Sequence, residues 1–324
     1  MRWRYQTSDP DYRATGDSVT EDFVFYPDGF GTRTVTVTRD PEWKYQFEEL
    51  ILMLPSGRFL PKSLLQAPIE VTSLQRERVL VSLPVRGSNP KNILDKLEEW
   101  PGDGETPALY RVRLHQEEPL SAVGFSLTNN GRPRAVAPVY DRGALVPPYS
   151  VLLAWPGTLG GIWFNEPFSQ KPFRSESIEV NDDDRGSRKK VVDTYVWLIG
   201  MSDEDDDRLI ERAAGFATPP NLEVTGATMV GDSFVPERRA SRMVVEKPTV
   251  GIRIGSGVSC VNPVFELSSA SGTLEAVQVD GVPIDPTSYA WDGETLWLDL
   301  TLSKSSELRL EFATDRSRDS LIPQ

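Results

Sequence analysis

The residues best suited to chemistry gather in one central stretch of the sequence, residues 140–197. This stretch mixes aromatic side chains with isolated polar and charged ones: Tyr140, Asp141, Arg142, Tyr149, Trp155, Trp163, Asn165, Glu166 and Trp197. Aromatic rings cover the apolar C–H side of a sugar ring, while carboxylates, amides and guanidinium groups satisfy its hydroxyls. Two carboxylates can also act as acid and base at a glycosidic bond. The stretch therefore predicts a surface that binds or processes a glycan or oligosaccharide.

Residue type suggests which member of this set would do what. The candidate catalytic residues are Tyr140, Asp141, Arg142, Glu166 and the single histidine, His115. The candidate substrate-binding residues are Trp155, Trp163, Tyr149, Asn165 and Trp197. If the chain is an enzyme, the mixture favours a glycoside hydrolase or a lyase, in which Tyr140 is the base and Arg142 neutralises a uronic carboxylate. In the competing interpretation the aromatic residues fill a wide β core, and Asp141 and Arg142 form an ion pair in a turn.

Several other kinds of site are excluded or disfavoured. One histidine cannot supply the common multi-histidine metal sites, and it weakens any nucleophile that depends on a histidine base. Gly160-Gly161 and Gly255-Ser256-Gly257 lack the strand–loop–helix context of a phosphate loop. The single cysteine, Cys260, permits no internal disulfide, and its apolar neighbours are typical of a cysteine that packs in a hydrophobic core. We therefore predict no cofactor and no metal, and an enzyme that binds metal through carboxylates alone is the remaining alternative.

The overall charge argues against some partners. The formal net charge of −13 opposes binding to DNA or RNA, which depends on Lys and Arg neutralising phosphates. A local basic stretch at residues 185–190 follows Asp182-Asp183-Asp184, so we interpret it as a solvated hairpin tip. No segment approaches the about 20 apolar residues of a membrane helix, so we expect a soluble chain with no membrane insertion. The first residues lack the apolar region of a signal peptide, and the sequence does not indicate the cellular compartment of the protein.

Strand and turn patterns dominate the chain. Residues 21–38 predict a hairpin, because Pro27-Asp28-Gly29 suits a turn and a β-branched run follows it. Residues 89–100 show helical spacing between Asn89-Pro90 and Pro101-Gly102. A second helix is predicted over Ser202–Ala214, with Ser202 as its cap and the acidic run 203–207 at its positive end. This position explains the acidic run better than a calcium loop does, since five consecutive acids point in different directions.

The sequence Thr218-Pro219-Pro220-Asn221 is the best linker. We therefore predict an all-β protein with two short helices and two domains. Residues 1–217 would form a large antiparallel β-sandwich and residues 218–324 a smaller C-terminal β-sandwich. Near the C-terminus, runs at 275–279, 296–300 and 308–312 alternate apolar and polar residues, as sandwich strands with one buried face do.

Four short motifs span most of the chain: Arg2-Trp3-Arg4-Tyr5, Tyr26-Pro27-Asp28-Gly29 leading into Gly31-Thr32-Arg33, Leu198-Ile199-Gly200, and Pro219-Pro220. Together they resemble bacterial carbohydrate-active proteins whose main domain is similar to a galactose-mutarotase-like β-supersandwich. The resemblance implies that large two-sheet fold and glycans as the class of substrate. It also implies histidines and tryptophans between Phe125 and Trp163, where this sequence has no histidine, so no catalytic residue is carried over.

A second hypothesis belongs to a different class of function. A non-catalytic structural or assembly protein would use its sheets for protein–protein contacts, in a homo-oligomer or a larger assembly. The small inventory of catalytic residues favours this alternative.

Overall fold

The chain is mostly β-strand, as predicted, and its strands form several sheets. The computed structural model describes residues 1–8, 14–42, 53, 64–81, 107–114, 120–128, 133–139, 159–164, 172–182, 186–255, 258–270, 272–303 and 305–313. By its internal contacts the chain divides into two compact units. Unit 1 comprises Met1–Phe25 and Gly29–Ile210, and unit 2 comprises Tyr26–Asp28 and Glu211–Gln324. The expected boundary between residues 217 and 218 stays a prediction.

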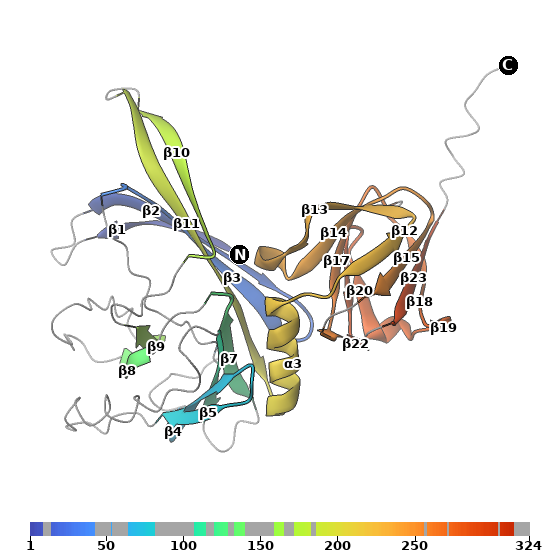
Figure 1. The fold of residues 1–324 in the computed structure, drawn as a ribbon, viewed down its shortest axis with the longest axis horizontal. Helices are drawn as coiled ribbons and strands as arrows, with labels where there is room; N and C mark the ends of the chain where they lie inside the picture. Colours follow the sequence, from blue (N-terminus) through green and yellow to red (C-terminus); the bar gives the residue numbers. More distant parts are fainter. Residues whose placement is uncertain are drawn as a thin grey trace. The chain divides into compact units, whose positions relative to one another are not determined.

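Unit 1 is built on one large antiparallel sheet (Figure 1). Its strands are β1 (Arg2–Ser8), β2 (Ala14–Phe25), β3 (Phe30–Arg39), β4 (Leu64–Ser73), β5 (Arg78–Val81), β6 (Ala108–Leu114), β7 (Ser121–Ser126), β10 (Arg174–Asp182) and β11 (Gly186–Ser202). The order across the sheet is β1-β2-β3-β11-β7-β6-β4-β5, and β10 pairs with β11 outside this path. A separate two-stranded sheet joins β8 (Pro133–Val139) to β9 (Leu159–Phe164).

The predicted hairpin at residues 21–38 is confirmed by the pairing of β2 with β3. Gly29 ends its turn with a φ of +77°, which glycine adopts without the steric cost that a Cβ brings. A Cβ at this position would also lie 3.0 Å from the carbonyl oxygen of Met201. The turn sequence and the close approach of β11 therefore both require glycine here.

The middle of the large sheet is buried on both faces. Along β3 successive side chains point to opposite faces, and both Val35 and Thr32 are fully buried. A charged pair lies in this interior: Nε of Arg33 donates to Oε2 of Glu21 at 2.8 Å, and both side chains are at most 4% exposed. The hydroxyl of Tyr5 donates to the other oxygen of Glu21 at 2.5 Å. Each charge is thus matched by an opposite charge or a hydrogen bond, as burial demands.

The described residues contain one α-helix, α3 (Asp206–Ala217). The prediction that this helix begins at Ser202 is wrong, because Ser202 ends strand β11. Oδ1 of Asp205 accepts the backbone N–H of Arg208 at 2.9 Å and so caps the helix in its place. The predicted apolar stripe is confirmed: Leu209, Ile210 and Ala213 are all buried. The helix predicted at residues 89–100 lies outside the described residues.

Unit 2 is the predicted small β-sandwich. One sheet has the order β12 (Leu222–Thr225), β15 (Thr249–Ile254), β23 (Glu307–Phe312), β18 (Leu274–Val279) and β19 (Val282–Pro283). The other has the order β13 (Ala227–Val235), β14 (Ala240–Val245), β17 (Val264–Ser268), β21 (Thr295–Leu298) and β20 (Tyr289–Trp291). The remaining elements are a short pair, β16 (Cys260–Val261) with β22 (Thr301–Leu302), and two 3₁₀ turns, η2 (Pro236–Arg238) and η3 (Pro286–Ser288).

The sandwich core lies between these two sheets. Strand β23 alternates as predicted, with Leu308, Leu310 and Phe312 in the core and Arg309 exposed. On β21, by contrast, Trp297 is also buried, in a second small cluster with Ala240 and Val264. The alternation of apolar and polar residues therefore predicts strand β21 correctly, but it does not predict that both faces of this strand are buried. On β17, the strand beside β21 in this sheet, Glu266 accepts hydrogen bonds from two arginines, Arg238 and Arg242.

Three residues from the turn between β2 and β3, Tyr26–Asp28, belong to unit 2. Oδ2 of Asp28 accepts from Arg212 at 2.7 Å and from Arg239 at 2.9 Å, and all three side chains are at most 6% exposed. The guanidinium of Arg239 also lies over the ring of Tyr26, 4.8 Å from its centroid. One buried carboxylate thus ties together a turn, a helix and a loop of unit 2.

Candidate interaction surface

The most prominent feature of unit 1 is the hairpin formed by β10 and β11, which extends beyond the rest of the sheet (Figure 1). Strand β11 pairs with β3 only from Val191 onward. Within the described residues, its first part, 186–190, pairs with β10 alone. We call residues 174–182 together with residues 186–190 the arm. This pairing confirms the predicted hairpin, and the residues of its tip, 183–185, lie outside the described residues.

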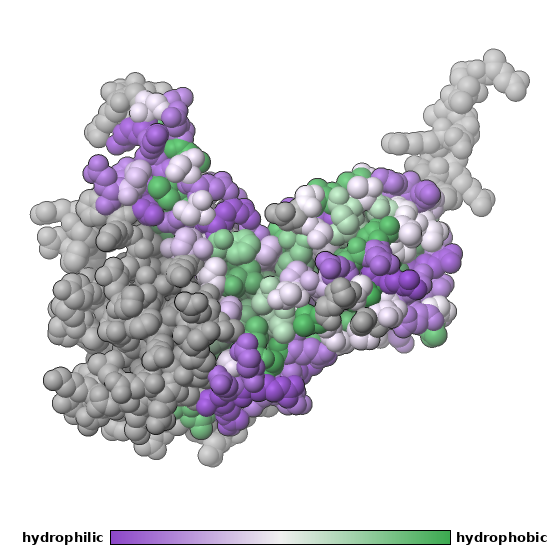
Figure 2. Space-filling view, in the orientation of Figure 1, coloured by the Kyte–Doolittle hydropathy of each residue, from purple (hydrophilic) through white to green (hydrophobic). Residues whose placement is uncertain are grey.

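The arm exposes apolar side chains together with charged ones. Every side chain from Phe173 to Asn181 is exposed, and Ile178 and Val180 retain 38% and 39% of their accessible surface. These two residues are two positions apart, so they point to the same face of the hairpin. Figure 2 shows such hydrophobic residues among hydrophilic ones on this hairpin. An isolated two-stranded ribbon has no core in which to bury them, so they are available to a partner.

The charges of the arm are divided between its two strands. The acidic residues lie on β10, which also begins with Arg174, paired with Glu176 at 3.9 Å, and Arg188, Lys189 and Lys190 lie on β11. Glu179 stands directly opposite Lys189, and Lys190 reaches Oδ1 of Asp40 at 3.0 Å. Opposite charges across a strand pair stabilise the ribbon slightly and fix its register. Beyond Arg174, the charged side chains that the outward edge of the arm exposes on β10 are therefore acidic, at Glu176 and Glu179.

A second exposed strand, β1, lies at the opposite end of the sheet order from β5. Its aromatic side chains Trp3 and Tyr5 are 49% and 42% exposed, and they share one face. The ring of Trp3 packs against Phe23 at 5.4 Å, and Phe23 in turn stacks with Phe25, which is 44% exposed. The alternate positions of β1 are basic, with Arg2 and Arg4 exposed. Exposed Trp, Tyr and Arg are the residue types enriched in protein–protein hot spots.

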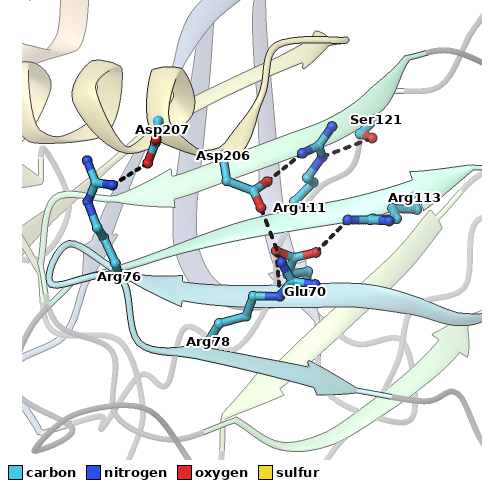
Figure 3. A network of polar contacts seen from close by, with 8 residues as sticks. All are labelled: Glu70, Arg76, Arg78, Arg111, Arg113, Ser121, Asp206 and Asp207. Carbon is cyan, nitrogen blue, oxygen red and sulfur yellow. Dashed lines mark hydrogen bonds and ion pairs between the residues drawn. The ribbon is translucent and has the colours of Figure 1, made fainter.

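A network of eight polar residues in unit 1 lies where β4, β5 and β6 meet the start of α3 (Figure 3). Its members are Glu70, Arg76, Arg78, Arg111, Arg113, Ser121, Asp206 and Asp207. Glu70 is 1% exposed and pairs with Nε of Arg78 at 3.0 Å and with Nη2 of Arg113 at 2.9 Å. Arg111 joins the sheet to the helix, because it pairs with Asp206 at 2.5 Å and donates to the hydroxyl of Ser121 at 3.2 Å.

This network has a structural role. Asp206 and Asp207 occupy the first turn of α3, where negative charge favours the helix. Asp206 pairs with Arg78 of β5, and Asp207 pairs with Arg76 in the turn between β4 and β5. A general acid or base needs a carboxyl group that is free to exchange a proton with a substrate, and Glu70 is instead held between two guanidinium groups. The network therefore anchors the start of the helix to the sheet.

Most of the residues predicted to bind or cleave a glycan lie outside the described residues. They are His115, Tyr140, Asp141, Arg142, Tyr149, Trp155, Asn165 and Glu166. Trp163 lies on β9, where its backbone pairs with Ala135, and its side chain is outside the described part. Trp197 lies on β11, directly opposite Arg33, and its side chain is 1% exposed. Its ring is therefore part of the sheet interior.

Among the described residues, no three acidic, cysteine or histidine side chains come close enough together to hold a metal ion. None of the helices in that part of the chain is long and apolar enough to cross a membrane.

Sequence reasoning did not single out either exposed strand as a working surface. The available signal was the strict alternation of basic and aromatic residues in Arg2-Trp3-Arg4-Tyr5, together with Ile178 and Val180 in an otherwise polar strand. No protein-family model matches the sequence, and a search of curated proteins finds no significant match.

Proposed function

We propose that this protein is a non-catalytic assembly subunit that contacts other protein chains through the exposed strands of its large sheet. The observation that carries the proposal is the arm, on which Ile178 and Val180 stay exposed on a hairpin that extends past its sheet. Monomeric proteins usually protect exposed strand edges by covering, shortening or bending them. An extended edge with apolar side chains is therefore best explained by a partner that covers it.

The division of charge on the arm supports the same proposal. Rows of like charge along an exposed strand steer a partner of opposite charge and disfavour other pairings. The paired state of Glu70 and of the acidic start of α3 also argues for a structural rather than a catalytic use of these carboxylates. Glycan binding by the aromatic and polar residues of segment 140–197 stays a prediction, since most of these residues lie outside the described part of the chain.

Sedimentation equilibrium of the purified full chain tests this function. We expect a mass above the 36.2 kDa of one chain at concentrations up to about 1 mM, the range that detects an interface worth roughly 4 kcal/mol. Ile178→Ser combined with Val180→Ser should lower the association without unfolding the chain, because both side chains are already exposed. Leu80→Ser is the matched control, since Leu80 is a 55% exposed apolar residue on β5.

A glycan array and a panel of polysaccharides, probed with the same preparation, complete the test. A chain that stays monomeric over the whole range and binds or cleaves a polysaccharide would overturn the proposal in favour of the glycan hypothesis. Association that is equally weakened by Leu80→Ser would also contradict it, because the arm would then have no special part.

A further inference from the structure

We infer that the partner of the arm is a second copy of this chain, and that β10 of one copy pairs with β1 of the next. The inference rests on the proposed function and adds the identity of the partner and of the strand that receives the arm. The inference is supported by β1 and β10, two edge strands of the large sheet whose exposed side chains complement each other.

Both strands have a free edge in the described part of the chain. There, β1 pairs only with β2 and β10 pairs only with β11. Among the residues that the structure describes, each strand therefore has one row of backbone N–H and C=O groups that faces no partner strand. Adding a strand to such an edge satisfies these groups by a regular ladder, as in β-augmentation.

The side chains of the two edges also fit each other. With the strands antiparallel and Arg4 opposite Glu179, Trp3 faces Val180 and Tyr5 faces Ile178. Aromatic residues opposite β-branched ones, and opposite charges across the pair, are the combinations that stabilise neighbouring strands. The same register places the four exposed apolar side chains on one face and the Arg4–Glu179 pair on the other. A shift by one residue would set apolar residues against charges.

A contact between two different edges has a consequence for symmetry. It joins the arm of one copy to β1 of another, so a two-fold dimer results only if the two copies exchange arms reciprocally. Head-to-tail contacts build a ring if the rotation closes and an open filament if it does not. The inference thus excludes a symmetric dimer in which β10 pairs with β10 or β1 pairs with β1.

Disulfide crosslinking between full-length chains tests the register. All variants contain Cys260→Ser, which removes the single native cysteine. One preparation contains Arg4→Cys and another contains Glu179→Cys, so the heterodisulfide between the two can form only between different chains. The matched control replaces Arg2, on the same face of β1 and two residues away, in a mixture with Glu179→Cys. Directly opposite Cβ atoms, about 4.5–5.5 Å apart, come close to the about 3.5–4.5 Å of a disulfide, and diagonal ones lie well beyond it.

We expect the heterodisulfide of Arg4→Cys with Glu179→Cys to form at least about tenfold faster than the control pair, the contrast between direct and diagonal neighbours. Ile178→Ser with Val180→Ser, placed in the Glu179→Cys chain, should abolish this difference. Equal rates for both pairs would indicate random collision and would overturn the inference.

The outcomes separate the two proposals. If the arm variant dissociates the assembly in sedimentation while the cysteine at position 4 crosslinks no faster than its control, the proposed function stands and the assignment of β1 fails. If the arm variant leaves the mass unchanged and no pair crosslinks preferentially, both fail. Charge reversal gives an independent check: Arg4→Glu should weaken association, and adding Glu179→Arg in the same chain should restore it.

Discussion

Replacing Arg33 by methionine should destabilise unit 1 severely. The guanidinium of Arg33 is 1% exposed and lies 2.8 Å from a Glu21 carboxylate that is 4% exposed. Without the guanidinium, the carboxylate stays in the sheet interior with the hydroxyl of Tyr5 as its remaining donor among the contacts described above. Removing one partner of a buried ion pair costs about 3–5 kcal/mol, because an uncompensated charge remains. For a unit of this size the melting temperature should fall by roughly 10 °C.

The double variant Arg33→Met with Glu21→Leu isolates the cause. It removes both charges and fills similar volume, so we expect it to recover most of the loss and to lie within about 2 kcal/mol of the wild type. Tyr5 is 42% exposed, so water can satisfy its hydroxyl in this variant. Arg2→Met serves as the surface control, since Arg2 of β1 pairs with Asp22, the neighbour of Glu21 on β2, but is 57% exposed. We expect no measurable loss there.

Urea unfolding followed by tryptophan fluorescence measures these differences, because Trp197 stands directly opposite Arg33 in the sheet. The reasoning would be refuted if the single variant lost less than about 1 kcal/mol, the range of an exposed pair. It would equally be refuted if the double variant were as unstable as the single one, since packing rather than the unpaired charge would then explain the loss.

Three other predictions concern unit 2. Burial alone would raise the pKa of Glu266, but hydrogen bonds from two arginines lower this pKa below its ordinary value. The ionised Glu266 therefore stabilises the folded state above the unfolded pKa, and this contribution is lost as the pH falls through the folded pKa. Glu266→Gln should consequently flatten the acid limb of a curve of unfolding free energy against pH. Leu310→Ala should cost about 2–5 kcal/mol in chemical denaturation, because the side chain is fully buried in the sandwich core, whereas Val282→Ala, at a 65% exposed position, should change little. Burial raises the pKa of the Cys260 thiol to about 11, so its alkylation by iodoacetamide at pH 8 should be far slower in the folded chain than in urea, and equal rates would contradict this.

Local patterns in the sequence predicted much of the fold. Pro27-Asp28-Gly29 identified a hairpin because a turn is decided by a few adjacent residues. The alternation in 308–312 identified β23 for the same reason. The start of α3 was misplaced because two residues, Ser202 and Asp205, can both cap a helix, and only the length of β11 decides between them. Similarly, alternation could not reveal that Trp297 is buried on the second face of its strand, since that face is covered by distant residues.

The candidate surface was harder to predict for a related reason. Exposure depends on which strands end at a sheet edge, and no local pattern states the order of strands in a sheet. Trp197 was expected at a binding surface and is buried, while Trp3 was not considered for one and is half exposed. The residue types alone do not distinguish these two positions.

The membership of Tyr26–Asp28 in unit 2 has a consequence for how the chain is made. Asp28 emerges from the ribosome long before Arg212 and Arg239, with which it forms its buried contacts. At about 5–20 residues per second, roughly 10–40 s separate Asp28 from Arg239. Throughout that interval the turn must remain accessible, so unit 2 cannot be completed in isolation from the N-terminal hairpin. Any recombination that exchanged the C-terminal sandwich would need to bring its own Asp28 with it.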